Sequence, residues 1–161
     1  MKQNQREIDI FSFAKVESTY AIMKELDSIF FEASSVRTFA SEATRTDFRE
    51  RWLGSYLVLN PEESFLAVTA AGEVAGYVVG DLRDPAANPR YSTLGYFRDF
   101  AQLTPAYPAH LHMNVASQHR SRGLGARLIA TFAAHAQAAG VPGIHVVTPA
   151  ATRTLGFYRR H

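Results

Sequence analysis

Residues 109–137 read AHLHMNVASQHRSRGLGARLIATFAAHAQ, and the rest of the chain can be interpreted outward from them. Apolar Leu111, Met113 and Val115 alternate with polar residues, which is the two-residue period of a half-buried strand. After the two glycines the period changes, because apolar residues recur at helical spacing as far as Gly140, a favourable residue just beyond a helix end. The stretch therefore predicts a strand, a glycine loop and a helix.

The loop, Arg120-Ser121-Arg122-Gly123-Leu124-Gly125, has the properties of an anion-binding site. The first turn of a helix has unpaired N–H groups at the positive end of the helix dipole, and glycines let an anion approach them. A dinucleotide fingerprint would need a glycine at Leu128, and a Walker loop would need Gly-Lys-Ser/Thr; the chain has neither. An ordinary strand-to-helix turn is the remaining alternative.

Composition limits the class of protein. A chain of 161 residues is expected to form one domain, and 47% apolar with 20% charged residues is ordinary for a soluble globular protein. The absence of cysteine excludes disulfides, thiol nucleophiles and cysteine zinc sites. The N-terminus lacks an apolar signal core and no run reaches membrane-spanning length, so a cytoplasmic location without a membrane partner is expected. The net charge of +2 is too small to indicate a nucleic-acid partner.

Periodicity outside this stretch predicts the other elements. They are a strand over 6–13, a helix over 17–33, a loop or short helix over 36–45, a helix starting at Thr46, two strands over 65–70 and 74–79, a fifth strand over 143–148 and a last helix over 151–160. Thr46 followed by Arg49 is half of a capping box. Gly76 inside a strand indicates a bulge or close packing.

Residues 83–108 form an insertion rich in proline and aromatic residues, with a possible short helix over 93–103. A loop of this length is often functional, so its aromatic side chains either cap a substrate site or pack against the sheet edge. The order of elements predicts a single α/β (α+β) domain over 1–161, built on a mostly antiparallel sheet with one βαβ unit at the glycine loop.

The motif Arg-x-x-Gly-x-Gly between a strand and a helix resembles the coenzyme A pyrophosphate loop of the GNAT N-acetyltransferase superfamily. Phe157-Tyr158 lies in a later helix where that superfamily usually has a tyrosine. From about Phe11 to His161 the chain follows the GNAT order of elements. The resemblance implies a mixed sheet with helices on both faces and acetyl-CoA as the cofactor.

A longer string is similar to bacterial GNAT-like proteins related to the C-terminal acetyltransferase-like domain of O-GlcNAcase, a group that includes domains whose acetyl transfer is doubtful. It comprises residues 94–97, Leu-Gly-Tyr-Phe, and residues 107–114, Tyr-Pro-Ala-His-Leu-His-Met-Asn.

The chain departs from the usual GNAT pattern in two places. Ala151 and Thr154 replace the Asn and Ala that commonly begin the last GNAT helix. The final strands of the family are absent from this sequence, and we expect that a tail is missing.

The resemblance also implies roles for individual residues. The strands over 111–115 and 144–148 would splay apart, with the pantetheine arm between them. Met113, Asn114 and Val115 would offer backbone groups to that arm, and one N–H would polarise the thioester carbonyl. The pyrophosphate would bind Arg120, Ser121, Arg122, Gly123, Leu124, Gly125 and Ala126. Tyr158 would give a proton to the departing thiolate; packing in an amphipathic helix is the alternative.

An amine acceptor must lose a proton. For a lysine of pKa ~10.4 at pH 7 the deficit is roughly 4.6 kcal/mol, whereas an α-amine of pKa near 8 needs only ~1.4 kcal/mol. His110 and His112 lie two residues apart on one strand face and are the candidate bases, with Asn114 able to hold a water; His145 is a weaker candidate. Each histidine can instead be structural. No metal site is expected, since no third ligand accompanies the two histidines.

Two functions remain open at this point. The first is an acetyl-CoA-dependent N-acetyltransferase acting by direct attack on an unidentified small-molecule or peptide amine. The second is an acetyl-CoA-binding domain with little or no catalysis, acting as a sensor or interaction module. An open polar cleft reaching His112 would favour the first, and a site sealed by Tyr91, Tyr96 or Tyr107 the second. A nucleic-acid-binding role lacks a basic stripe, and the sequence leaves a homodimer open.

Overall fold

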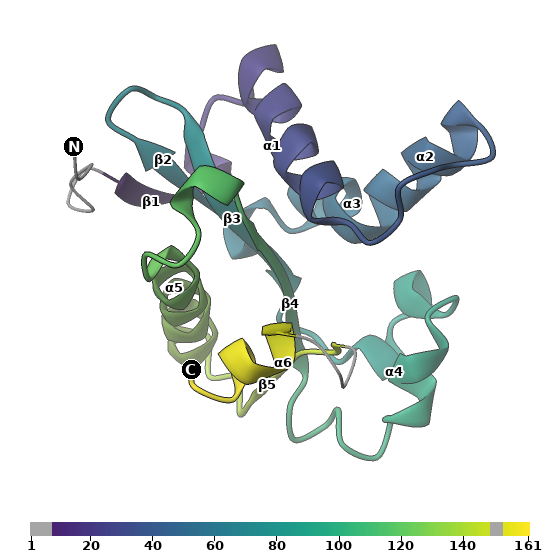
Figure 1. Cartoon of the computed structure of the whole chain (residues 1–161). Coiled ribbons are helices and arrows are strands. Elements are labelled where there is room, and N and C mark those ends of the chain that lie inside the picture. Colours follow the sequence, from purple (N-terminus) through teal and green to yellow (C-terminus); the bar gives the residue numbers. More distant parts are fainter. Residues whose placement is uncertain (1–7, 149–152) are drawn as a thin grey trace. The chain divides into compact units, whose positions relative to one another are not determined.

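The computed structural model describes residues 8–148 and 153–161. The helices are α1 (Tyr20–Ala33), α2 (Glu42–Arg49), α3 (Ser55–Leu59), α4 (Gly95–Asp99), α5 (Leu124–Ala138) and α6 (Arg153–Tyr158). The strands are β1 (Ile8–Ser12), β2 (Phe65–Thr69), β3 (Val74–Asp81), β4 (Ala109–Val115) and β5 (Ile144–His145). Figure 1 shows these elements along the chain.

The strands form one five-stranded sheet in the order β1-β2-β3-β4-β5. β1 pairs antiparallel with β2, and β2 antiparallel with β3, whereas β4 and β5 are parallel. Helix α5 connects the parallel pair, which is the βαβ unit predicted around the glycine loop. The predicted fold class, a mixed and mostly antiparallel sheet with helices, is therefore confirmed.

The chain divides into two compact units. The first unit comprises residues 1–80 and 112–132, and the second comprises residues 81–111 and 133–161. The single domain predicted over 1–161, with its insertion, stays a prediction.

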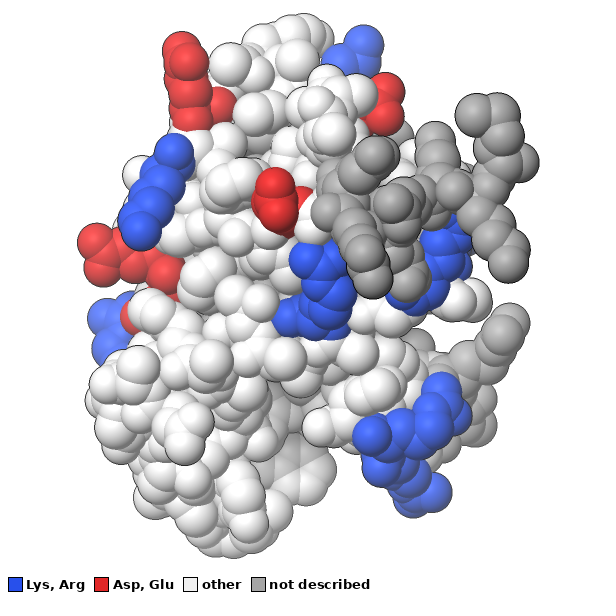
Figure 2. Space-filling view, turned by 90° about the vertical axis from the view of Figure 1, so that its left-hand side faces the viewer, with Lys and Arg blue, Asp and Glu red and all other residues white. Residues whose placement is uncertain are grey.

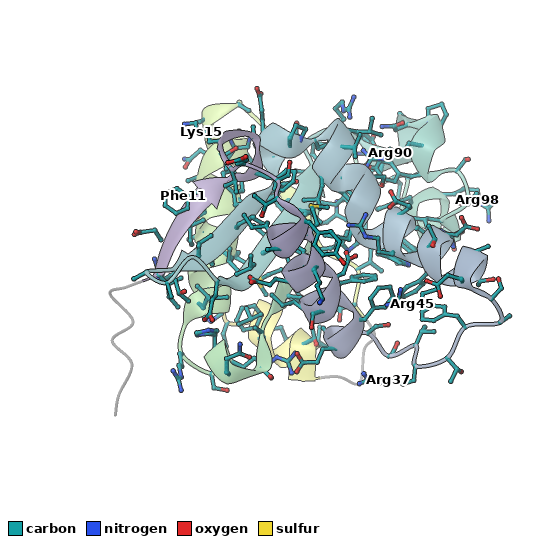
Figure 3. The ribbon with its side chains drawn as sticks, turned by 90° about the horizontal axis from the view of Figure 1, so that it is seen from above. Phe11, Lys15, Arg37, Arg45, Arg90 and Arg98 are labelled. Carbon is teal, nitrogen blue, oxygen red and sulfur yellow. The ribbon has the colours of Figure 1, made fainter. Side chains whose placement is uncertain are left out.

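In the first unit, α1 and the beginning of α5 lie on opposite faces of β1–β3 (Figure 1). The Thr19 side chain accepts a hydrogen bond from the Ile22 amide, so α1 begins three residues later than the predicted Glu17. The alternation expected in β1 is present, because Ile10 is half-buried and Phe11 is exposed. Phe11 projects from this edge strand in Figure 3.

The predicted helix start at Thr46 is wrong. Helix α2 begins at Glu42, because the Ser41 side chain accepts from the Thr44 amide and caps it, which leaves Thr46 inside the helix. A π-helical segment, Glu50–Gly54, then joins α2 to α3. A Cβ on Gly54 would meet the Arg49 guanidinium and the Glu50 carboxylate, so the absence of a side chain here gives these two groups room.

The structure has both of the features that Gly76 indicated as alternatives, a bulge and close packing. The register between β2 and β3 shifts after the Ala67–Gly76 pair, which is a bulge. A Cβ on Gly76 would lie 3.0 Å from the Asn114 carbonyl oxygen, which is closer than a side chain normally allows. β4 therefore approaches β3 closely at Asn114, inside the candidate site.

In the second unit, two elements are shorter than predicted. β5 covers only Ile144–His145 instead of 143–148, and its pairs are Ala109–Ile144 and His110–His145. Within the insertion, α4 covers Gly95–Asp99 instead of 93–103, and turns follow it. The last helix was predicted from Ala151, which lies outside the described residues.

A buried carboxylate ties the insertion to the end of β3. Asp81 is fully buried and accepts hydrogen bonds from the Arg83 side chain at 2.9 and 3.0 Å and from the Tyr91 hydroxyl at 2.9 Å. Arg90 lies 3.7 Å from the same carboxylate. Burial alone raises the pKa of Asp81, but the hydrogen bonds from Arg83 and Tyr91 outweigh it and hold the pKa below its ordinary value.

Candidate functional site

The glycine loop has the backbone geometry of an anion cradle. Ser121 and Gly123 have positive φ angles of 59° and 80°, and α5 begins directly after them. The Arg127 amide donates to the Gly123 carbonyl at 3.2 Å and closes the first helical turn. Within the described residues, no hydrogen bond is donated by the amides of residues 121–126. These N–H groups are therefore available to an anion at the positive end of α5.

The two arginines of the loop differ. Arg120 donates its Nε–H to the Val115 carbonyl at 2.9 Å, and its guanidinium lies 4.0 Å from Glu32. Arg122 is exposed and makes no hydrogen bond or ion pair with any residue that the structure describes. The first arginine therefore shapes the loop, and the second leaves its charge free for a ligand.

Asn114 is held by a tyrosine that the sequence did not single out. Its side-chain Nδ2 donates to the Tyr77 hydroxyl at 2.7 Å. Burial raises the pKa of Tyr77, and the hydrogen bond from Asn114 offsets only part of that shift, so the phenol stays neutral. Met113, Asn114 and Val115 are all half-buried, and the Val115 carbonyl is already used by Arg120.

His112 lies between two aromatic residues of the first unit. Its Nε2 and the Tyr56 hydroxyl share a hydrogen bond of 3.2 Å, and the Trp52 ring meets it edge-on at 5.2 Å between centroids. Tyr56 is fully buried. The ring is therefore fixed by core residues, and its Nε2 is engaged.

His110 belongs to the second unit and has a different environment. Only 2% of it is exposed, and its ring packs edge-on against Tyr91 at 4.9 Å and against Phe97 at 5.0 Å. His145 lies beside it, with 5.7 Å between the ring centroids. The predicted pair of bases is thus divided between the two units, and His110 is enclosed by the insertion.

Tyr158 lies in α6 of the second unit and is half-buried. Burial raises the pKa of its hydroxyl above the ordinary value, so the group keeps its proton at neutral pH. The Phe157 ring packs edge-on against it at 5.4 Å. The described neighbours of Tyr158 are compatible with both alternatives, a proton donor and a packing residue.

Sequence reasoning missed the contributions of Tyr56 and Tyr77. They contact residues 56 and 37 positions away, and a contact over that separation leaves no local pattern. Phe48, Trp52 and Tyr56 recur at helical spacing, a pattern that indicates a shared helix face but not the histidine that this face contacts.

Figure 2 shows how charged side chains are distributed over one face of the molecule. On the face in Figure 2, the coloured basic and acidic side chains are interspersed, and the blue ones form no continuous stripe. In the part of the chain that the structure describes, every helix is too short or too polar to cross a bilayer.

The chain resembles known proteins in sequence and in fold. A sequence model described as the acetyltransferase (GNAT) family matches residues 20–161. The crystal structure of SsHAT is 21% identical, with a TM-score of 0.72 over 96% of this chain and 89% of that one. A GNAT family acetyltransferase from Brucella melitensis in complex with acetyl-CoA is 18% identical, with a TM-score of 0.55 over 95% and 80%. The NatC complex bound to Gag peptide and CoA is 15% identical, with a TM-score of 0.63 over 96% and 82%. At these identities the structural likeness concerns the fold.

Proposed function

This chain belongs to the acetyltransferase (GNAT) family, and from that membership we propose that it transfers an acetyl group from acetyl-CoA to an amine by direct attack in a ternary complex. The observation that carries the proposal concerns the backbone N–H groups of residues 121–126, none of which donates a hydrogen bond to a described residue. Within this loop, Ser121 and Gly123 have positive φ angles. They lie between β4 and α5, at the start of the longest helix that the structure describes.

The loop fits a pyrophosphate on steric grounds too. A Cβ built on Gly123 would meet no described atom within 4 Å, so the space over this glycine is open. Arg122 adds a charge that no described residue neutralises. An anion with two phosphates would satisfy the free N–H groups and this charge together.

Acetyl-CoA supplies a thioester, and the residues of this chain handle protons and orientation. We assign the backbone of Met113, Asn114 and Val115 to the pantetheine arm and Tyr158 to the proton that the leaving sulfur takes up. The Tyr158 hydroxyl is protonated at neutral pH, as a proton donor to the sulfur must be.

Among the predicted bases, His112 with Asn114 is the better supported. The His112 ring is half-buried, and its Nε2 shares a hydrogen bond with the Tyr56 hydroxyl. His110 is enclosed by Tyr91 and Phe97, which supports a structural role for it. An acceptor that is already neutral at pH 7 would need the least from such a base.

A second candidate is the acetyl-CoA-binding module without catalysis. The burial of His110 and the engagement of His112 Nε2 favour it, because a free base is then missing from β4. The similarity to the O-GlcNAcase-related group points the same way. That similarity, the cytoplasmic location and a homodimer stay predictions.

One experiment separates the two candidates. Acetyl-CoA is titrated into the protein by calorimetry, and thiol release is then followed across a panel of lysine peptides, α-amines and aromatic amines. Saturable binding with release by one amine class is the result expected for the enzyme. Binding without release by any amine would support the module, and an absence of binding would contradict both.

A further inference from the structure

A pocket of about 450 Å³ opens in the first unit between the end of α1 and the beginning of α2. A volume of this size holds a small organic molecule. None of residues 120–126 lines it, so it is distinct from the glycine loop. The lining residues used below are Phe31, Val36, Arg37, Phe39, Glu42 and Arg45.

Arg45 is held in the wall of this pocket by two contacts. Its guanidinium lies over the Phe31 ring, 3.7 Å from the centroid, which is a cation–π contact. Its Nη1 donates to the Glu42 carboxylate at 3.3 Å, but the Glu42 side chain is 81% exposed, so water screens the pair and it is weak. A planar guanidinium that is stacked on a ring keeps its other N–H groups in its plane, where a carboxylate binds two of them.

Arg37 contributes a second guanidinium to the same pocket. It is exposed, and its Nη1 donates to the Glu32 backbone carbonyl at 3.2 Å, near the end of α1. That contact alone would fit an arginine that caps a helix end. It uses one of five N–H donors, however, and Arg37 forms no ion pair with any described residue. Both arginines are labelled in Figure 3. The Arg37 charge is therefore available to a ligand.

The charges and the apolar surface of the wall define the ligand. Two arginines and one glutamate line the pocket, which leaves one positive charge in excess. A single negative charge balances it, whereas the second charge of a phosphate ester would have no partner. The rings of Phe31 and Phe39 are half-buried and meet edge-on at 6.0 Å, and Val36 is 37% exposed. These side chains offer a surface to a flat apolar ring.

A neighbouring pocket shows where the charged end of such a ligand belongs. It has a volume of about 270 Å³, shares Val36 with the first pocket, and is lined by Phe30, Phe48 and Asn114 among others. None of the residues lining it is Asp, Glu, Lys or Arg. An anion would therefore find a counter-charge only on the side of Arg37 and Arg45.

We propose that the pocket between α1 and α2 binds an aromatic carboxylate, with the carboxylate held by Arg37 and Arg45 and the ring against Phe31 and Phe39. This site goes beyond the proposed acetyl transfer and does not depend on it. All of its residues belong to the first unit.

The test follows the backbone amide shifts of the ¹⁵N-labelled protein during titration with benzoate and, separately, with benzyl alcohol, which has the same ring and no charge. Benzoate is expected to bind about tenfold more tightly, the effect of hydrogen bonds to a charged group, and added salt should reduce this advantage. Arg37→Gln and Arg45→Gln should each remove most of it. Arg51→Gln, at an exposed arginine that does not line the pocket, should keep it.

Glu42→Gln tests the site through a gain of affinity, which a loss of folding would not produce. With the competing carboxylate removed, benzoate should bind several-fold more tightly. Asp47→Asn makes the same change of charge at an exposed position of α2 outside the pocket, and it should leave the affinity within about twofold. Unchanged or weaker binding of benzoate by Glu42→Gln would overturn the proposal.

Equal affinities for benzoate and benzyl alcohol, or an unaltered benzoate affinity in both arginine variants, would also overturn the site. Gly123→Val should bind benzoate as the unchanged protein does. Loss of benzoate binding in that variant would assign the anion to the glycine loop and overturn the pocket. Acetyl-CoA binding is measured in parallel, so the two proposals fail separately: benzoate binding without acetyl-CoA binding would contradict the acetyltransferase alone, and the converse would contradict this site alone.

Discussion

Arg120 donates its Nε–H to the backbone carbonyl of Val115 at 2.9 Å, which ties the glycine loop to the end of β4. Arg122, two residues later, has no such partner in the described chain. The same residue type thus has two different environments within three positions, and sequence alone could not separate them.

Replacing these arginines should give opposite results. Arg120→Ala removes a hydrogen bond of the loop and should lower the free energy of unfolding by about 1 kcal/mol. Arg122→Ala should leave stability unchanged and weaken acetyl-CoA binding several-fold, an effect that shrinks as salt is added. Thermal melts and calorimetry at two salt concentrations measure both. Equal effects of the two variants would contradict the division of roles.

Asp81 should be the most sensitive carboxylate of the second unit. Asp81→Asn leaves Arg83 and Arg90 beside a neutral group and should cost about 3 kcal/mol of unfolding free energy. Asp99 is exposed and pairs only loosely with Arg98, at 3.9 Å, so Asp99→Asn is the matched control, with an expected cost below about 1 kcal/mol. Denaturant melts would contradict this account if both variants behaved alike.

The lowered pKa of Asp81 also predicts how stability depends on pH. The folded state holds this proton less tightly than the unfolded state, so the contribution is complete above the unfolded pKa of about 3.9 and is lost as pH falls through the lower folded pKa. Unfolding measured between pH 6 and 2 should show this loss in the unchanged protein. Asp81→Asn should flatten that part of the curve, and an unchanged slope would remove Asp81 as its source.

Tyr158→Phe should slow thiol release by roughly ten- to a hundredfold while acetyl-CoA affinity stays within a few-fold, because a general acid acts in the transition state. The raised pKa also predicts that the unchanged enzyme keeps this function above the usual tyrosine pKa of about 10. Tyr20→Phe, at an 83% exposed tyrosine, is the control. Unaltered turnover in Tyr158→Phe would leave packing as its only role.

The region around the glycine loop could be predicted because its signals are local. Helix α5 was expected between the glycine loop and Gly140 and covers Leu124–Ala138, with Leu124, Leu128 and Phe132 buried along one face. Gly140 follows it with a φ of 75°, as its place beyond the helix end predicted. The period of the apolar residues, the position of Gly140 and the backbone geometry therefore all indicate the same helix.

Other features depend on contacts between distant residues and left no local signal. The Ser41 cap competed with an equally plausible one at Thr46, and only packing selects between them. Apolar residues after His145 resemble a strand, yet they line a pocket instead of pairing. The partners of His112 and Asn114 likewise come from other elements, which is why the candidate bases could be named but their environments could not.

The central claim is that free amides at the start of α5 hold the phosphates of acetyl-CoA. Gly123 and Gly72 have similar φ angles, 80° and 85°, and neither has an atom within 4 Å of a built Cβ, so valine at either strains the backbone alike, by about 1–3 kcal/mol. Calorimetric titration of acetyl-CoA should show binding to the Gly72→Val variant and none to Gly123→Val. Equal binding by the two variants would contradict the claim.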